Sequence, residues 1–411
     1  MPVEFDRIPP QAVRPNPPRF WIWLYSFFIL LALYGVGVVV FWDEEGRELS
    51  SVLGVRIIEL SFIWWAAYCS RALYYVIKQR IADGWDIARE VNVQSRIQQG
   101  RRYLQVYAAS SYTALRTDES DSQGQANAVL NGAKALKMQP SRLNGHAVRH
   151  SRLPGDLNED PGRALLNILR SVLKDLAGTL AELGDDIQIC LSLDVESRLD
   201  KDQVDKVWRK VCGEVGIRQL LVPIEWSALD AVERWLDQRH EDQDLLMVIV
   251  VVIAHHAPQD TAEAAVGLLF GSECLQPSLN PMAILHRPEQ ARGESAVAVT
   301  RAIHQSLYWA SVQSEEIEHV WQAGIGHIHQ SALVAALNEA ELSVHDGRFV
   351  HNLDKLLGHP RKAAPWISLA LAAQVIESGA GSQLILCGDA YAEAALWAEV
   401  MAPVPPLSRL E

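Results

Sequence analysis

The amino-acid sequence predicts an α/β protein in which an N-terminal transmembrane helical hairpin precedes a layered α/β domain with a mixed sheet. Three observations support this prediction. Residues 20–41 form a long apolar run without a charged side chain, and a weaker apolar run covers 57–77. From residue 164 onward, helical periodicity alternates with short apolar runs. The chain has 411 residues, 49% of them apolar, which exceeds one typical domain and suffices for a large core.

The first apolar run, FWIWLYSFFILLALYGVGVVVF (20–41), is long enough to cross a hydrocarbon core of about 30 Å as a helix. It has no small-residue cleavage site and follows a proline-rich lead, which is atypical of a cleaved signal peptide. A buried core helix is the alternative interpretation. The length of the run and the aromatic residues at its ends favour a membrane span.

The second apolar run, IIELSFIWWAAYCSRALYYVI (57–77), is interrupted by charge. Glu59 lies near its start and Arg71 near its end, where long side chains can reach the membrane interface. Trp64 and Trp65 lie at its centre, which is unusual because tryptophan is enriched at the interface. A second span is one interpretation of this run, and an amphipathic helix that lies in the interface is the other.

Charges that flank the two runs predict an orientation. Arginines precede the first run, the connecting segment WDEEGRELSS (42–51) is acidic, and basic residues follow the second run from Lys78 onward. The positive-inside rule therefore predicts an inner-membrane protein with both termini and the large domain in the cytoplasm. If only one run inserted, the domain would face the opposite side. The five cysteines are scattered and lack CxxC spacing, which favours a reducing compartment and two spans.

The segments between the hairpin and the α/β pattern are more polar. Residues 78–102 predict a polar juxtamembrane helix, 103–112 have mixed strand and helix signals, and 137–163 are rich in Pro, Gly, Asn and Arg, as in an exposed connection. The predicted parts of the chain are an N-terminal cytoplasmic tail (1–19), a two-helix membrane hairpin (20–80), a juxtamembrane segment with a linker (81–160) and an α/β domain (161–411).

Alternating patterns predict the elements of the α/β domain. Helical spacing of apolar residues predicts helices over 164–180, 204–215, 228–238, 296–310, 315–323, 331–340 and 365–377. Short apolar runs predict strands over 187–193, 219–224, 245–254, 265–270, 282–286 and 383–387. The run LLMVIVVVIA (245–254) is typical of a central strand that is covered on both faces. Strands separated by helices predict a mixed sheet with helices on both faces.

Composition and missing motifs disfavour several classes of function. The net charge is −13 with a pI near 5.5, which disfavours nucleic acid as a partner. The sequence contains no GxxxxGK[ST], no GxGxxG after a strand, no GxSxG and no HExxH. Common sites for nucleotides, dinucleotides, serine hydrolysis and zinc proteolysis are therefore not predicted, and we expect no cofactor and no metal.

Three polar groups have the residue types of a site without its full pattern. His255 and His256 end the central strand, where α/β folds often bind ligands, but no nearby acidic pair fixes a tautomer. His327 and His329 have the i, i+2 spacing of a metal pair on a strand, without a third ligand at motif distance. Cys274 could be a nucleophile, yet no neighbour in the sequence activates it. Structural roles are favoured for all three groups.

The stretch HNLDKLLGHPRKAAPWISLALA (351–372) has the composition of an active-site loop, because Gly-His precedes a helix of small and apolar residues. It resembles the Gly-His-x-x-Gly-Ala-Ala segment of β-ketoacyl synthases in the thiolase superfamily, whose histidine assists decarboxylative condensation. His359 matches that histidine, and Lys355 lies four residues before it, one off the family's usual lysine offset of five. AEAAVGLLFG (262–271) and SQLILCGD (382–389) are similar to two strands of these synthases, the second to their last strand.

The resemblance covers roughly residues 160–400 and implies a thiolase-like fold, but parts of the catalytic set are missing. The family's nucleophilic cysteine lies at a small-residue helix start well upstream of the 262–271 strand, where this chain has only Cys190 and Cys212, in other contexts. The family's first histidine has no counterpart, and 360–362 (Pro-Arg-Lys) replace small residues that shape the pocket. Acyl transfer needs a nucleophile, a base and an oxyanion hole within reach of one another. We therefore expect a thiolase-like domain without catalysis.

The whole chain is also similar to a family of bacterial proteins encoded with type VI secretion systems, which combine a membrane anchor with a degenerate α/β domain. The similarity rests on the two apolar runs, QVYAASSYTALR (105–116), SALDAVERWLDQR (227–239) and the 351–372 stretch. Some members are adaptors that bring a toxic effector to the secreted spike. The resemblance thus implies a non-catalytic adaptor or accessory protein that contacts the lipid bilayer and a protein of the secretion machine or its effector.

Two alternative functions remain open. The chain could be a membrane-associated acyltransferase or ketoacyl-synthase-like enzyme, with catalysis assigned to His359, Lys355, Cys274 and Cys212. It could also be a structural subunit of an envelope complex in which the hairpin is the functional part. The sequence predicts no particular oligomeric state.

Overall fold

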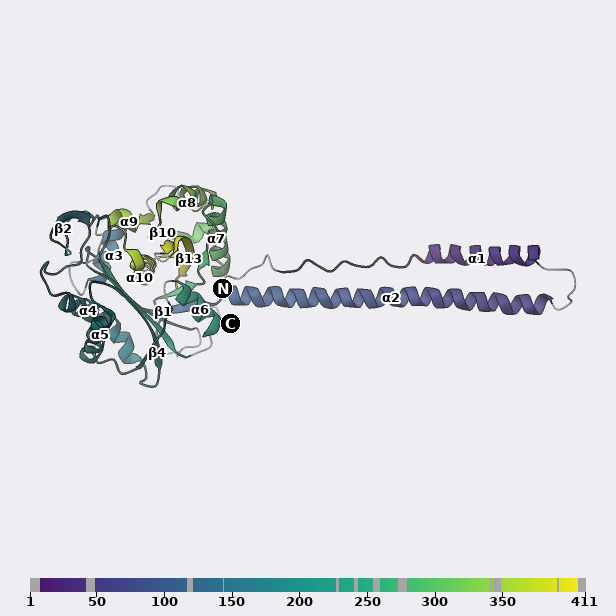
Figure 1. Cartoon of the computed structure of the whole chain (residues 1–411), viewed down its shortest axis with the longest axis horizontal. Coiled ribbons are helices and arrows are strands. Elements are labelled where there is room, and N and C mark those ends of the chain that lie inside the picture. The colour runs from purple at the N-terminus through teal and green to yellow at the C-terminus, as the bar shows by residue number, and fades with distance from the viewer. Residues whose placement is uncertain are drawn as a thin grey trace. The chain divides into compact units, whose positions relative to one another are not determined.

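The computed structural model divides into two compact units, one formed by Glu4–Ile97 and a larger one that begins at Gln98. Figure 1 shows the two helices of the first unit and the mixed α/β architecture of the second. The structure describes residues 8–41, 49–116, 121–142, 144–226, 229–239, 243–253, 259–272, 279–340, 342, 349–389 and 392–405.

The N-terminal unit is a pair of helices, α1 (Phe20–Phe41) and α2 (Leu49–Gly100). Aromatic side chains hold them together. Trp64 Nε1 donates a hydrogen bond to the carbonyl of Trp23 at 3.2 Å, and the rings of Trp64 and Phe27 pack with centroids 5.0 Å apart. An indole can bury its ring and still satisfy its N–H in this way, which explains a central tryptophan in an apolar helix.

The segment before α1 lies along α2. Arg14 Nη2 forms an ion pair with Asp86 at 2.8 Å, and the backbone N–H of Ala12 donates to the same carboxylate at 3.0 Å. Trp85 Nε1 donates to the carbonyl of Pro10 at 3.2 Å. Proline fixes an extended backbone and leaves carbonyls unpaired, so a proline-rich segment can accept hydrogen bonds from a neighbouring helix.

Among the described residues, α1 is the one helix long and apolar enough to cross a membrane by length and composition, over Phe20–Gly37. The run 57–77, predicted as a second span, lies inside α2 and does not meet the same criterion. Its charged, Trp and Tyr residues lower its mean hydropathy. The polar segment 78–102, predicted as a separate helix, instead continues α2 without a break to Gly100.

The larger unit is built on one sheet whose two halves have the same topology. The first half contains β1 (Tyr103–Tyr112), β4 (Gln188–Glu196), β5 (Leu220–Pro223), β6 (Leu245–Val252) and β7 (Ala264–Gly271). The second half contains β8 (Ala283–His286), β10 (Ile317–Ala323), β11 (Val350–Asn352), β12 (Ser382–Asp389) and β13 (Ala392–Ala402).

The strands of each half lie in the spatial order third, second, fourth, fifth, first. In both halves the second strand pairs parallel with the third and the fourth, and the fifth pairs antiparallel with the fourth and the first. The two first strands, β1 and β8, pair antiparallel and join the halves. The domain is therefore an internal duplication, and the predicted mixed sheet is confirmed.

Helices divide the larger unit into five layers. The outer helices of the first half are α4 (Pro161–Glu182) and α5 (Lys201–Val215), and those of the second half are α7 (Ala296–Ala310) and α8 (His327–Glu339). The helices α6 (Asp230–Gln238) and α10 (Ala364–Glu377) share the central apolar core with inward side chains of both halves. Each half of the sheet is thus covered on both faces, as predicted.

Shorter elements complete this architecture. They are α3 (Ser122–Leu130), the hairpin of β2 (Lys137–Pro140) and β3 (Ala147–His150), β9 (Glu289–Gln290), α9 (Leu353–Leu356) and the 3₁₀ turns Ser314–Glu316 and Arg361–Ala363.

The central layer explains two sequence patterns. All eight side chains of β6 are buried, alternately toward α4 and toward α10, which confirms the central strand predicted from LLMVIVVVIA. Every residue of α10 from Ala364 to Ile376 is buried, and many of them are alanine. Small side chains let both halves of the sheet approach this helix at the density of a protein interior.

Three sequence predictions that concern the main sheet differ from the structure. Residues 315–323, expected as a helix, include β10, which pairs on both sides; apolar spacing does not separate helix from strand in so short a run. Residues 103–112, assigned to a linker, form β1 at the centre of the sheet, so the compact unit begins well before residue 161. The strand 382–389 is not the last one, because β13 follows it.

Candidate functional site

The loop between α9 and α10 contains the histidine singled out in the sequence. Gly358 has φ +97°, and a Cβ at this position would lie 2.6 Å from the carbonyl oxygen of Thr261, so only glycine fits. The N–H of His359 donates to the carbonyl of Asp260 at 2.8 Å, and its own carbonyl accepts from the N–H of Ala262 at 3.0 Å. These bonds attach the loop to the segment that enters β7.

His359 is half-buried, and one nitrogen of its imidazole forms a hydrogen bond. Its Nδ1 accepts a hydrogen bond from the backbone N–H of Arg361 at 3.0 Å. The neutral ring therefore has its proton on Nε2. In this state His359 can donate one hydrogen bond to an oxygen, but Nδ1 cannot accept a proton from a thiol without losing the backbone contact.

The residues after His359 are tied to the first half of the domain. Arg361 Nε lies 2.9 Å from Glu196 Oε1, and Lys362 Nζ lies 3.1 Å from Asp194 Oδ1; both acidic residues are on β4. Arg361 also adopts φ +50°, a left-handed conformation that a non-glycine residue adopts only when its surroundings impose it. Long charged side chains thus replace the small residues of the synthase loop and fix its position.

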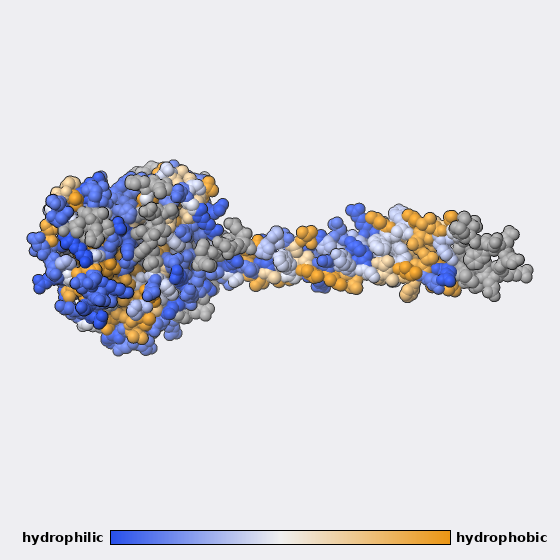
Figure 2. All heavy atoms as spheres, in the orientation of Figure 1, coloured by the Kyte–Doolittle hydropathy of each residue, from blue (hydrophilic) through white to orange (hydrophobic). Residues whose placement is uncertain are grey.

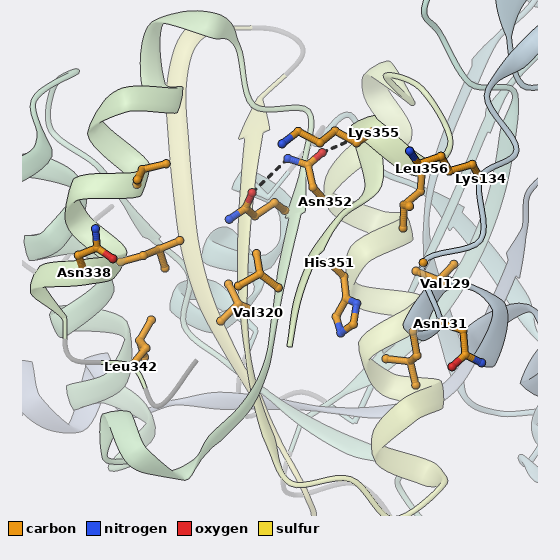
Figure 3. A pocket seen from close by; sticks show the side chains of 16 residues that line it. Val129, Asn131, Lys134, Val320, Asn338, Leu342, His351, Asn352, Lys355 and Leu356 are labelled. Atoms are coloured by element: carbon orange, nitrogen blue, oxygen red, sulfur yellow. Dashed lines mark hydrogen bonds between the residues drawn. The ribbon is translucent and has the colours of Figure 1, made fainter. Parts of the chain in front are cut away.

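Asp354 takes the position five residues before His359, where the resemblance places a lysine. Its Oδ1 accepts from the N–H of Gly324 at 2.9 Å and its Oδ2 from the N–H of Ile325 at 3.2 Å. Burial raises the pKa of Asp354, and these two hydrogen bonds act against that shift. Lys355 is exposed and lines a separate cavity, whose lining does not include His359 (Figure 3). The two residues that the sequence suggested as partners therefore do not share a cavity.

Cys212 is on the far side of the sheet from His359. It lies on α5 and packs in the outer core of the first half, whereas the His359 loop joins the central core. Burial raises the pKa of the Cys212 thiol to about 11, so it is not a thiolate at neutral pH. Cys274 lies outside the described residues.

Cys190 faces the central core, where its sulfur contacts Arg239. It is fully buried on β4, and Arg239 Nη1 lies 3.1 Å from its sulfur. Asp194, which contacts Lys362 of the His359 loop, lies four residues further along the same strand. At about 3.3 Å per residue, Cys190 lies roughly 13 Å along β4 from the position that contacts the His359 loop.

The helix α6 is the counterpart of α10 in the duplicated topology, since each connects the third and fourth strands of its half. It is also a helix upstream of the 262–271 strand, within the region around 187–260 in which the resemblance places a nucleophile. No cysteine occurs between residues 213 and 273. The first turn of α6 contains Asp230 and Glu233, and negative charge at this end of a helix would disfavour a thiolate.

The other histidines of the sequence analysis do not form a metal site in the described structure. His327 and His329 lie in the first turn of the helix α8 and not on a strand, so the strand spacing assumed for a metal pair does not apply. His329 is buried. No group of three His, Cys, Asp or Glu side chains suitable for a metal is present among the described residues. His255 and His256 lie outside them.

One group of residues that sequence reasoning missed lies at the edge of the second half. His319 Nδ1 and His351 Nε2 are 3.1 Å apart, and the ring centroids of His351 and Trp321 are 4.8 Å apart. Burial lowers the pKa of His351 to about 4, so this side chain is neutral at physiological pH. Because 315–323 was expected as a helix, its register against β11 was not available from the sequence.

Comparisons with known proteins show the fold. No protein-family model and no curated protein matches the chain. Among solved structures, the ishigamide ketosynthase/chain length factor matches with a TM-score of 0.54 and 16% identity, covering 74% of this chain and 100% of that chain. The ketosynthase ApeO in complex with its chain length factor ApeC, from Xenorhabdus doucetiae, matches with a TM-score of 0.52 and 11% identity, covering 74% and 98%.

A β-ketoacyl synthase from Burkholderia phymatum STM815 matches with a TM-score of 0.50 and 12% identity, covering 74% of this chain and 100% of that chain. At these identities the similarity establishes architecture and not activity. The predicted thiolase-like architecture is confirmed: the larger unit of this chain has the fold of the ketosynthases.

Proposed function

We propose that this chain is a membrane-anchored protein whose ketosynthase-like domain binds a protein partner and does not catalyse acyl transfer. The observation on which this proposal rests is the absence of any cysteine from residues 213 to 273, which include α6 and the residues before it. Without a thiol at this helix, the half-buried imidazole of His359 lacks a nucleophile at the helix that corresponds to α10 in the other half. The ion pairs of Arg361 and Lys362 support a structural role for the loop.

The anchor in this proposal is the N-terminal helix pair, of which α1 is the most apolar part. Most of the described residues of α1 are exposed, with Trp21, Ile29 and Leu33 each at least 60% accessible. Figure 2 shows apolar side chains exposed along the helices of the N-terminal unit. An exposed apolar helix of this length is stable in a bilayer and not in water. We propose that α1 and the 57–77 run of α2, which pack together through Phe27 and Trp64, enter the inner membrane as a pair. With both runs inserted, the positive-inside rule places the ketosynthase-like domain in the cytoplasm.

The partner in this proposal is a component of a type VI secretion system or an effector of one, as the family resemblance implies, and the chain acts as its adaptor. One structural neighbour is a ketosynthase in complex with its chain length factor, so a domain of this fold can present a surface to a second protein. For the present chain, a binding role would account for a ketosynthase-like fold that has no cysteine from residues 213 to 273.

The proposal is tested by chemical cross-linking in membranes of the host cell, followed by affinity purification of the full-length tagged chain and quantitative mass spectrometry. A tagged inner-membrane protein of unrelated fold is the control. We expect a secretion component or effector to be enriched over this control. Recovery of the chain with no such protein, from cells in which the system is expressed, would contradict the proposal.

A further inference from the structure

A groove follows the short edge strand β11 of the larger unit. It has a volume of about 720 Å³, within the range of sites that bind ligands. The helix α8 forms one wall and the end of α3 the other, with β10 and β11 between them (Figure 3). The apolar walls include Val334 and Leu337 on α8 and Val129 on α3, and Val334 is 61% exposed.

Among the described residues, the outer edge of β11 has no partner strand on the side of this groove. The N–H of Val320 donates to the carbonyl of Phe349 at 2.8 Å, and Val320 is the parallel partner of Val350. In a parallel ladder this register directs the carbonyl of Phe349 and the N–H of His351 toward β10, and both backbone groups of Val350 away from it. No described strand pairs with that outer side of β11. An exposed strand edge is a template for an added strand.

The charge of the groove differs from that of the chain. Its lining among the described residues contains Lys134 and Lys355 and no Asp or Glu, although acidic residues outnumber basic ones by 50 to 37 in the sequence. Both lysines are exposed, and Figure 3 shows them at the same end of the groove. This end is therefore complementary to a carboxylate.

We propose that the β11 groove binds an extended peptide of a partner protein, which adds a strand to β11, packs apolar side chains against α3 and α8, and places an acidic side chain against Lys134 and Lys355. The inference rests on the proposed binding function and names the chemistry of the partner. A second copy of the chain is a poorer occupant, because symmetric pairing of two β11 edges would bring the lysines of both copies together.

The test is a selection of random decapeptides displayed on phage against the full-length chain in detergent, with counter-selection against the variant Val334→Glu. Selected peptides are synthesised and their dissociation constants measured by fluorescence polarisation. We expect peptides with alternating apolar residues and an Asp or Glu. Val334→Glu should weaken their binding at least tenfold, and Lys134→Met with Lys355→Met about fivefold through loss of two exposed charge contacts.

Two further variants and a folding measurement make the result specific. Val297→Glu, at a valine that is 64% exposed on α7 and outside the groove lining, should leave binding within twofold. Val350→Pro removes the N–H that points away from β10 and leaves the hydrogen bonds between β10 and β11 in place. If the peptide pairs with β11, this variant should weaken binding, and N-methylation of the peptide backbone should weaken it to a similar extent. Thermal unfolding of each variant verifies that it is folded.

The inference is overturned if no peptide is enriched over the Val334→Glu counter-selection, or if the selected peptides bind Val334→Glu and wild type alike. Light scattering that shows a dimer abolished by Val334→Glu would also overturn it, in favour of self-association. If the cross-linked partner of the proposed function is recovered equally with Val334→Glu, the binding function stands and this groove is not its site.

Discussion

Raising the pH from 6.5 to 8 should destabilise the larger unit, because a buried glutamate must lose its proton. Glu399 on β13 has no exposed surface. The thiol of Cys387 lies 3.7 Å from its Oε1, and its Oε2 has no hydrogen-bond partner among the residues that the structure describes. Burial raises the pKa of Glu399 to about 8, so the folded chain holds this carboxyl protonated at neutral pH.

The magnitude follows from linkage. A folded-state pKa above the unfolded value means that the bound proton stabilises the fold fully below the unfolded pKa of about 4.3, and that this stabilisation is lost as the pH rises through about 8. Each pH unit in this window costs about 1.4 kcal/mol, so Glu399 contributes a loss of about 2 kcal/mol between pH 6.5 and 8. Burial raises the pKa of Glu289 to about 7, which adds a smaller loss at the start of the window.

The buried histidines do not obscure this effect. Burial lowers the pKa of His286 and of His351 to about 4. A depressed histidine pKa makes stability rise with pH between that value and the unfolded pKa of about 6.5, and adds nothing above it. Of these four groups, only Glu399 and Glu289 therefore change the free energy of unfolding as the pH rises above 6.5.

The assay is urea unfolding of the full-length chain in detergent at pH 6.5 and pH 8, followed by tryptophan fluorescence. We expect the free energy of unfolding of the wild type to fall by about 2 kcal/mol or more over this range. Glu399→Gln mimics the protonated carboxyl and should remove about 2 kcal/mol of that fall. Glu182→Gln, at an exposed glutamate on α4, should leave it unchanged. A wild-type slope in Glu399→Gln would refute the reasoning.

Two other substitutions test the described contacts. Arg287 is fully buried and forms an ion pair with Asp237 at 2.6 Å. Arg287→Ala should therefore cost about 3–5 kcal/mol of unfolding free energy, because it removes the ion-pair partner of a partly buried carboxylate. Arg218→Ala, in an exposed pair, should cost under about 1 kcal/mol. A loss below about 1 kcal/mol in Arg287→Ala would contradict the first expectation. Gly358→Ala combines φ +97° with a contact of 2.6 Å to the carbonyl of Thr261 and should cost about 2 kcal/mol or more, measured in the same urea assay; a wild-type midpoint would show that the loop is not constrained there.

The sequence predicted the α/β architecture because its strongest signals are those of buried elements. The run at β6 and the small apolar residues of α10 are buried on all sides, so packing selects their composition whatever the neighbouring elements are. The topology was available only through the resemblance at the His359 loop. No repeat of fixed short period is visible in the sequence, so the duplication is apparent only from the strand order.

The predictions that differ from the structure involve tertiary pairing. β10 has apolar residues at spacings that suit a helix or a strand, and its pairing on both sides decides between them. β1 begins directly after the long helix α2, and the mixed signals of 103–112 gave no hint that it joins the two halves. The ion pairs from Arg361 and Lys362 to β4 connect residues more than a hundred positions apart, so only the fold reveals them.

The most direct test of the account is acylation of the full-length chain. The purified chain in detergent is incubated with acyl-CoA and with acylated carrier protein, and intact mass spectrometry measures any covalent adduct, with an authentic ketosynthase as the positive control. The account predicts an unmodified chain under conditions that acylate the control. An acyl group on any cysteine, lost in the matching Cys→Ser variant, would contradict it and would identify the domain as an enzyme.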